Sequence, residues 1–224
     1  FELNRSEEFS QNTLLKNEKE YLGIYVSSHP LDTEKELLSI IEHMNISDLE
    51  GFRNRRKIGR FTRIRLIGIV KNLNKIVTKT SGEPMAKFQL EDFTGTVEVT
   101  CFPKDYIKSG YKIREDLIMM VEGHINEEGN KYSVNLNTVN GLEELEENKF
   151  LNLYVLIDDE TREMVNDLKR LLIRNKGNNQ IFLAIAANNK REVIKLNKKY
   201  NVNLSRKFIG QLIKMIGIKK IKIR

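Results

Sequence analysis

A run of positive charge between residues 51 and 82 is the stretch of this 224-residue sequence best suited to bind a ligand. It contains ten Lys or Arg and no Asp or Glu. Cations spaced along a chain neutralise phosphates, and aromatic rings beside them stack on bases, so the pattern favours single-stranded nucleic acid as the partner. With cations and rings further along the chain, the candidate binding residues are Arg63, Arg65, Lys71, Lys75, Lys79, Lys87, Phe102, Lys104 and Tyr106. Because so few of them are aromatic, the predicted binding is mainly electrostatic, tolerant of sequence and sensitive to salt.

Five short strands between residues 62 and 140 are predicted to position these side chains. Two segments show strict alternation of apolar and polar residues, and their apolar members are Ala86, Phe88, Leu90, Val97, Val99 and Cys101. Period-2 alternation places those residues on one face, toward a core. The opposite face is predicted to carry Lys87, Gln89, Thr100 and Phe102. Five strands at this spacing predict a small β-barrel of the oligonucleotide-binding (OB) class over residues 61–142. Gly68, inside the first strand, is predicted to mark a bulge or sharp bend.

The segment before the barrel is predicted to be helical, and the segment after it is predicted to contain both helices and strands. Residues 1–60 are interpreted as a helical linker, with Thr33 as the N-cap of an amphipathic helix. After a charged stretch at 141–148, the order strand, helix, strand, strand, helix, strand predicts a small α+β domain over residues 149–224. Asn203 is the predicted N-cap of its second helix. Seventeen Lys or Arg against three Asp or Glu between residues 161 and 224 leave a DNA role for this domain open.

Residue patterns for catalysis or metal binding are weak. His29 stands before a proline with no Cys near it, which is more typical of a structural histidine than of a ligand. Asp158, Asp159 and Glu160 follow a strand, but a two-metal site would need further acids from neighbouring strands. We therefore predict no catalytic residue, no metal site and no cofactor. Cys101 is interpreted as a small buried hydrophobe in a reducing compartment.

Two motifs resemble one known family. The first is EKEYLGIYVSSHPLD, in which the matching residues are Glu18, Glu20, Leu22, Gly23, Tyr25, Ser28, His29, Pro30 and Leu31. The second matches at Thr78, Lys79, Gly82, Met85, Leu90, Glu91, Asp92, Thr94, Gly95, Phe102 and Pro103. In this order they resemble the C-terminal region of bacterial replicative DNA polymerase III alpha subunits. The resemblance covers essentially the whole chain and is looser in the last domain.

The resemblance implies a division of labour. The barrel would bind single-stranded template DNA, the last domain would bind the tau subunit of the clamp loader, and the polymerase active site would lie outside this chain. It also implies a cytoplasmic location in the replisome. Because the sequence begins at Phe1 rather than Met, we interpret it as a piece of a longer protein. QNTLL at residues 11–15 faintly resembles a sliding-clamp peptide, although a helix start is the stronger interpretation, and in this family the clamp motif lies upstream.

Two other functions stay open at this stage. The chain could be a nuclease or nucleotidyl transferase in its own right, which the scarcity of acids in the basic regions disfavours. It could also be a pure protein-interaction scaffold of the replisome, because OB barrels host unrelated functions. No apolar run approaches the roughly 20 residues of a membrane helix, so no membrane association is predicted.

Overall fold

The computed structural model describes residues 18, 21, 29–51, 63–79, 81–128, 131–147, 151–158, 161–187 and 190–224. The basic residues between 53 and 60, the QNTLL segment, Asp159 and Glu160 lie outside the described residues. Within the described ranges, no helix is long and apolar enough to cross a membrane.

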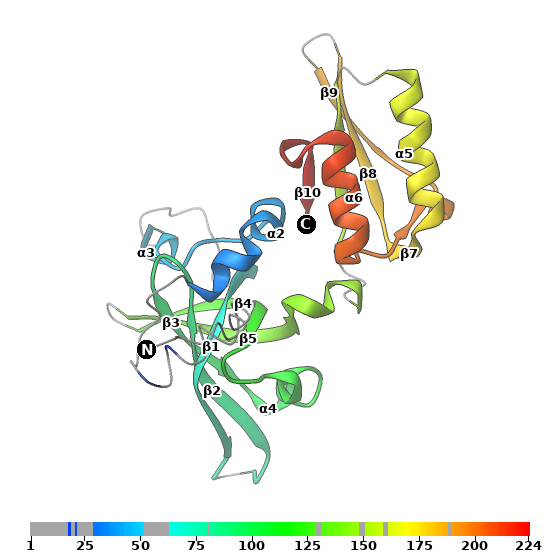
Figure 1. Cartoon of the computed structure of the whole chain (residues 1–224). Coiled ribbons are helices and arrows are strands. Elements are labelled where there is room, and N and C mark those ends of the chain that lie inside the picture. The colour runs from blue at the N-terminus through cyan, green and yellow to red at the C-terminus, as the bar shows by residue number, and fades with distance from the viewer. Residues whose placement is uncertain are drawn as a thin grey trace, which may run out of the picture.

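A closed five-stranded barrel forms the middle of the chain, as predicted (Figure 1). Its strands follow the order β1-β2-β3-β5-β4 and have the bounds β1 (Arg63–Val77), β2 (Pro84–Glu91), β3 (Thr96–Cys101), β4 (Ile118–Glu128) and β5 (Lys131–Gly141). The first part of β1 pairs with β4 and the second part pairs with β2, so one long strand closes the barrel. Two short helices, α4 (Pro103–Tyr106) and η3 (Gly110–Lys112), connect β3 to β4.

The inner faces of β2 and β3 are as the alternation predicts. All six apolar residues assigned to the core are buried. Burial, with a smaller effect of Asp105, raises the pKa of the Cys101 thiol to about 12, so the thiol stays protonated. On the other face Lys87, Gln89 and Phe102 are exposed. Thr100 pairs with Lys87 across the ladder and therefore lies on the same face, as predicted, but it is only 7% exposed and offers no surface to a ligand.

Gly68 does not mark a β-bulge, which was one of the two roles predicted for it. The register shift in the β1–β2 pair lies between Lys71 and Asn74, where Asn72 adopts a left-handed φ of 52°. At Gly68, an added Cβ would lie 2.5 Å from the backbone oxygen of Glu91. The glycine therefore allows close approach of β2, and the bulge sits a few residues later along β1.

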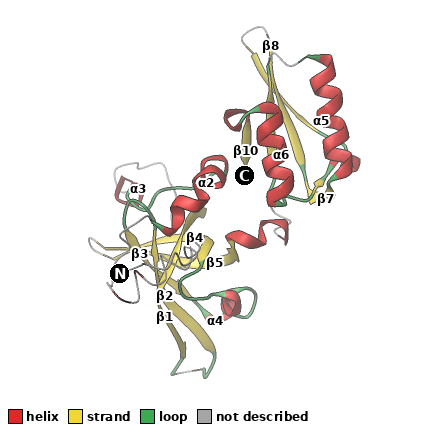
Figure 2. Cartoon of the chain, in the orientation of Figure 1, coloured by secondary structure: helices red, strands yellow, loops and turns green. Residues whose placement is uncertain are grey.

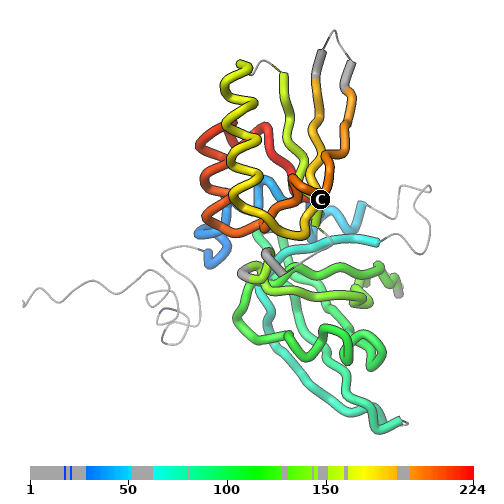
Figure 3. The backbone as a smooth tube through the Cα atoms, turned by 90° about the vertical axis from the view of Figure 1, so that its right-hand side faces the viewer, coloured from blue at the N-terminus to red at the C-terminus, as the bar shows by residue number. Residues whose placement is uncertain are grey.

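The C-terminal domain follows the predicted order with one addition. Its elements are β6 (Leu153–Ile157), α5 (Arg162–Arg174), β7 (Lys176–Asn179), β8 (Ile181–Ala187), β9 (Lys190–Lys195), η5 (Lys198–Tyr200), α6 (Arg206–Ile216), η6 (Ile218–Lys220) and β10 (Ile221–Ile223). A four-stranded sheet has the order β10-β6-β8-β9, and Figure 3 shows both long helices on one side of it. The short β7 was not expected from the sequence. The N-cap of α6 is Ser205, whose hydroxyl accepts from the Phe208 N–H, and not Asn203.

The segment before the barrel packs against both the barrel and the C-terminal domain. It contains η1 (Pro30–Glu34), α2 (Lys35–Ile40) and α3 (Asp48–Gly51), coloured blue in Figure 1. Thr33 is not the N-cap of the amphipathic helix: α2 has Glu34 at that position, without a side-chain capping hydrogen bond. The capped start is that of η1, where the His29 ring accepts from the Leu31 N–H and Asp32 accepts from the His29 N–H. This geometry supports the structural interpretation of His29.

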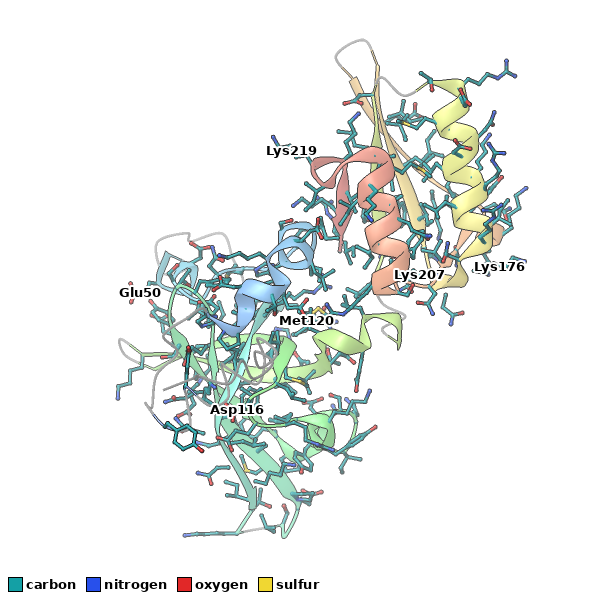
Figure 4. The ribbon with its side chains drawn as sticks, in the orientation of Figure 1. Glu50, Asp116, Met120, Lys176, Lys207 and Lys219 are labelled. Atoms are coloured by element: carbon teal, nitrogen blue, oxygen red, sulfur yellow. The ribbon has the colours of Figure 1, made fainter. Side chains whose placement is uncertain are left out.

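Backbone hydrogen bonds tie this segment to both domains. The Glu42 N–H donates to the Ile223 carbonyl at 2.8 Å, which extends the β10 edge of the C-terminal sheet. The Met44 N–H donates to the Arg65 carbonyl at 2.8 Å on the barrel side. One apolar cluster contains residues of the segment, of the C-terminal domain and of the barrel, including Met120, which lies between them in Figure 4. After β5, η4 (Leu142–Glu147) provides the covalent connection.

Candidate nucleic-acid interface

The hairpin of β1 and β2 continues past the barrel wall as a projecting arm. We define the β1–β2 arm as residues 72–79 and 81–84, all of which are exposed or half-exposed. Figure 2 shows it as a two-stranded ribbon that points away from the C-terminal domain. Its loop is held by hydrogen bonds from the Thr78 N–H to the Glu83 carbonyl and from the Gly82 N–H to the Thr78 carbonyl. The arm therefore presents a defined surface to solvent.

Two candidate cations lie on this arm. Lys75 pairs with Ala86 in the ladder and has an exposed side chain, and Lys79 lies in the exposed loop. Ile76 and Val77 between them are 42% and 63% exposed. The sequence did not reveal these two as surface residues, because apolar residues in a strand normally indicate a core. Only the extension of the hairpin beyond the barrel exposes them.

Three further candidates lie where β2 and β3 leave the barrel beside the arm. Lys87 sits on the outer face of β2, 3.7 Å from Glu98, and both side chains are about half exposed. Phe102 follows β3 directly and is 46% exposed. Lys104 is exposed on α4, which packs beside β2. Phe102, Lys87 and Lys104 therefore lie at the base of the arm that carries Lys75 and Lys79.

Tyr106 differs from Phe102. It is half-buried and packs against the barrel core. A Cβ added at Gly110 would lie 2.8 Å from the Tyr106 ring, so the ring rests directly on the Gly110 backbone. This contact favours a packing role for Tyr106.

Arg63 and Arg65 lie at the other end of β1, and both bind Glu122 of β4. The distances are 2.5 Å from Arg63 Nη2 to Glu122 Oε2 and 2.7 Å from Arg65 Nη2 to Glu122 Oε1. Burial raises the pKa of the Glu122 carboxyl, but hydrogen bonds from Arg65 and the charges of both arginines outweigh it and hold that pKa below its usual value. The two arginines therefore neutralise a half-buried carboxylate within the protein.

Lys71 is also engaged within the barrel. Its residue is 7% exposed, and its ammonium lies 2.5 Å from Asp116. A phosphate could reach this cation only by displacing the carboxylate. Of the nine candidates, the structure brings Lys75, Lys79, Lys87, Phe102 and Lys104 together at one end of the barrel and separates Arg63 and Arg65 from them.

Acidic and metal-binding clusters are scarce in the described part of the chain. Across the described ranges, no group of three or more His, Cys, Asp or Glu residues is placed to hold a metal ion. Asp158, at the end of β6, pairs with Lys220 at 2.5 Å.

The barrel defines the class of this protein region. Residues 64–141 match the family model described as the OB-fold nucleic acid binding domain. The fold seen in the structure and this match agree on the same span.

Curated relatives are similar to this chain beyond the barrel as well. The chain is 28% identical over 214 residues to DNA polymerase III subunit alpha of Mycobacterium leprae, covering 94% of this chain and 18% of the relative. It is 26% identical over 221 residues to that of Bacillus subtilis (98% and 19%) and 34% identical over 177 residues to that of Thermus aquaticus (77% and 14%). The resemblance found in the motifs is confirmed: the chain is related to a segment of DNA polymerase III alpha subunits. It spans less than a fifth of the length of these relatives.

Solved structures are less similar. A chain of a Replication Protein A heterotrimer bound to ssDNA matches with a TM-score of 0.29 and 19% identity, over 36% of this chain and 57% of that chain. A similarity this low says nothing further about the present chain.

Proposed function

We propose that this chain is a non-catalytic segment of a DNA polymerase III alpha subunit whose barrel binds single-stranded template DNA. The polymerase chemistry would take place in another part of the protein, in the bacterial cytoplasm at the replisome. The relation to DNA polymerase III alpha subunits over 94% of the chain supports the assignment to replication.

One structural observation carries the proposal for DNA. Lys75 and Lys79 lie on the exposed β1–β2 arm, and Lys87, Lys104 and the half-exposed ring of Phe102 lie at the end of the OB barrel from which the arm projects. Cations along a path and a ring for base stacking are what single-strand binding requires. With one exposed ring in this group, phosphate contacts supply most of the affinity, so binding is sequence-tolerant and falls with salt.

A titration tests this proposal. The anisotropy of a fluorescein-labelled dT oligonucleotide is followed as the chain is added, in a series of salt concentrations. Binding at low salt that weakens steadily with salt supports the proposal, and a mixed-sequence oligonucleotide should bind within a few-fold of dT. Negligible affinity at the lowest salt contradicts it. Lys75→Glu with Lys79→Glu in the arm should weaken binding. The matched control is Lys169→Glu with Lys176→Glu, two exposed lysines of the C-terminal domain; Figure 4 shows Lys176 far from the arm.

We further propose that the C-terminal domain binds the clamp-loader tau subunit, on the strength of the family resemblance. Pull-down of purified tau by the whole chain, and its loss when residues 151–224 are removed, would support this. Retained DNA binding by the shortened chain would show that the barrel is still folded. Tau capture by the shortened chain would contradict the assignment. Contact with the sliding clamp is assigned to sequence upstream of this chain.

A protein-interaction scaffold is the second candidate, and the exposed Ile76 and Val77 on the arm favour it. Successive residues of a strand point to opposite faces, so the arm exposes one apolar side chain on each face, and a protein that closes around the arm would cover both. The titration above separates the two functions, because a scaffold would show no affinity for the oligonucleotide at low salt.

A further inference from the structure

The C-terminal sheet has one covered face and one open face. α5 and α6 pack on the covered face, where Leu153, Val155 and Ile181 are buried (Figure 3). Successive residues of a strand alternate between faces. Tyr154 and Phe182 therefore point to the open face, which no helix covers within the part of the chain that the structure describes, and both are half-buried.

A row of four side chains crosses this open face. The ladder pairs Lys222 of β10 with Tyr154 of β6, Tyr154 with Phe182 of β8, and Phe182 with Lys195 of β9. The order across the sheet is therefore basic, aromatic, aromatic, basic. Lys222 and Lys195 are both exposed.

The two rings form one stack with an arginine. The Tyr154 and Phe182 ring centroids lie 4.7 Å apart with an interplanar angle of 10°. The Arg224 guanidinium lies 5.0 Å from the Tyr154 centroid. On the other side of the stack, Lys195 occupies the edge strand, next to Val193, which is 56% exposed. The row of side chains thus runs from β10, which the segment before the barrel contacts, to β9 at the other edge of the sheet.

The charges around the stack are mostly positive. Arg224 pairs with Glu42 at 2.6 Å, and the Lys222 ammonium donates to the Ser39 carbonyl at 2.8 Å, so both are positioned by the segment before the barrel. Three exposed cations around two aromatic rings complement a strand with phosphates outside and bases inside. Aromatic residues on an open four-stranded sheet are a known solution for stacking single-stranded bases.

We propose that the open face of the C-terminal sheet is a second binding site for single-stranded nucleic acid. Phe182 and Arg224 cover the two faces of the Tyr154 ring, so a base stacks on the outer face of Phe182, and phosphates lie near Lys195, Lys222 and Arg224. The site is separate from the barrel and does not depend on binding there.

A single-tryptophan reporter tests this site directly. The sequence contains no Trp, so Phe182→Trp places the only one at the end of the stack that a base can reach. Titration of the whole chain with a dT oligonucleotide of on the order of 12 nucleotides should quench the fluorescence of this reporter as bases stack on it. The control is Ile173→Trp, which places the reporter at an exposed position of α5, on the covered side of the sheet. It should show no comparable quenching.

A second set of variants covers the possibility that the reporter disturbs the stack. Phe182→Leu keeps an apolar side chain without the ring, and combined with Lys195→Glu it should weaken binding about tenfold, close to the loss of one stacked base. Both measurements are repeated with Lys75→Glu and Lys79→Glu in the barrel. Quenching of the Phe182→Trp reporter that persists there supports an independent site, even if the barrel does not bind DNA.

Two outcomes would contradict the proposed second site. If the oligonucleotide binds but the Phe182→Trp reporter is not quenched, and Phe182→Leu with Lys195→Glu binds as tightly as the wild type, the face is not a nucleic-acid site. A protein partner then becomes its better occupant. If quenching disappears together with the barrel lysines, the sheet is not a separate site.

Discussion

The two parts of β1 carry similar cations but use them differently. Arg63, Arg65 and Lys71 lie in the part of β1 that belongs to the barrel wall, and each contacts a carboxylate of the protein. Lys75 and Lys79 lie on the β1–β2 arm, and their side chains are exposed to solvent. The difference arises from neighbours: β4 brings Glu122 opposite Arg65, and the turn before β4 brings Asp116 to Lys71. Along β1, the cations that no acid of the fold contacts are the ones most available to a ligand.

The ion pairs in the barrel can be broken at Glu122. Glu122→Gln should lower the free energy of unfolding by about 2 kcal/mol, because it removes a charged acceptor from two arginines in a half-buried site. Urea denaturation at pH 7 measures this. DNA affinity should change less than twofold if these arginines serve the fold. A large gain in affinity would instead show that Glu122 competes with phosphate for them.

The same contrast applies to two rings, Phe102 and Tyr106. Phe102→Leu should weaken oligonucleotide binding by about 1 kcal/mol with little effect on stability, because the exposed ring is available for stacking. Tyr106→Leu should do the reverse, since it leaves space above Gly110 in the packed core. Urea denaturation and the anisotropy titration, applied to both variants, separate the two effects. If both variants weakened binding equally, the assignment of stacking to Phe102 and packing to Tyr106 would be contradicted.

Lowering the pH should remove the contribution of Glu122 to the free energy of unfolding. Its pKa is lower in the folded chain than in the unfolded one, so its stabilising effect is complete above the unfolded pKa of about 4.3 and is lost as the pH falls through the lower folded pKa. The stability difference between wild type and Glu122→Gln should therefore narrow as the pH is lowered below about 4. Urea unfolding at several pH values measures it. A difference that stays constant to low pH would contradict the lowered pKa.

Lys71→Met should have the smallest effect. A buried cation is replaced by an apolar side chain of similar length, and the partner Asp116, whose side chain is 64% exposed, remains hydrated. Stability should change by less than about 1 kcal/mol, and DNA affinity by less than twofold. A tenfold loss of affinity, measured by the same titration, would show that Lys71 reaches the DNA after all.

Strand alternation was sufficient to predict the core of β2 and β3, since a half-buried strand repeats every two residues. Local capping was less predictable: Thr33 and Asn203 are suitable N-cap types, but His29 and Ser205 make the capping hydrogen bonds. Several residues near a helix start can cap it, and tertiary packing decides among them.

Pairing between distant strands was beyond the sequence. The Arg65–Glu122 and Lys71–Asp116 contacts join residues that are 57 and 45 positions apart. They depend on the register of β1 against β4 and on where the turn before β4 falls. For the same reason, the projection of the arm, and with it the exposure of Ile76 and Val77, could not be read from residue types.

The most direct test compares two charge-matched double variants by the salt dependence of oligonucleotide binding. Lys75→Gln with Lys79→Gln removes the arm cations, and Arg63→Gln with Lys71→Gln removes the same charge from inside the barrel. Each lost phosphate contact lowers the slope of log affinity against log salt by about 0.7 for a single strand. The arm variant should therefore lose about 1.4 in slope and bind at least several-fold more weakly at low salt, while the barrel variant keeps the slope of the wild type. Equal slopes for the two variants, or a larger loss from the barrel variant, would contradict the assignment of DNA binding to the arm.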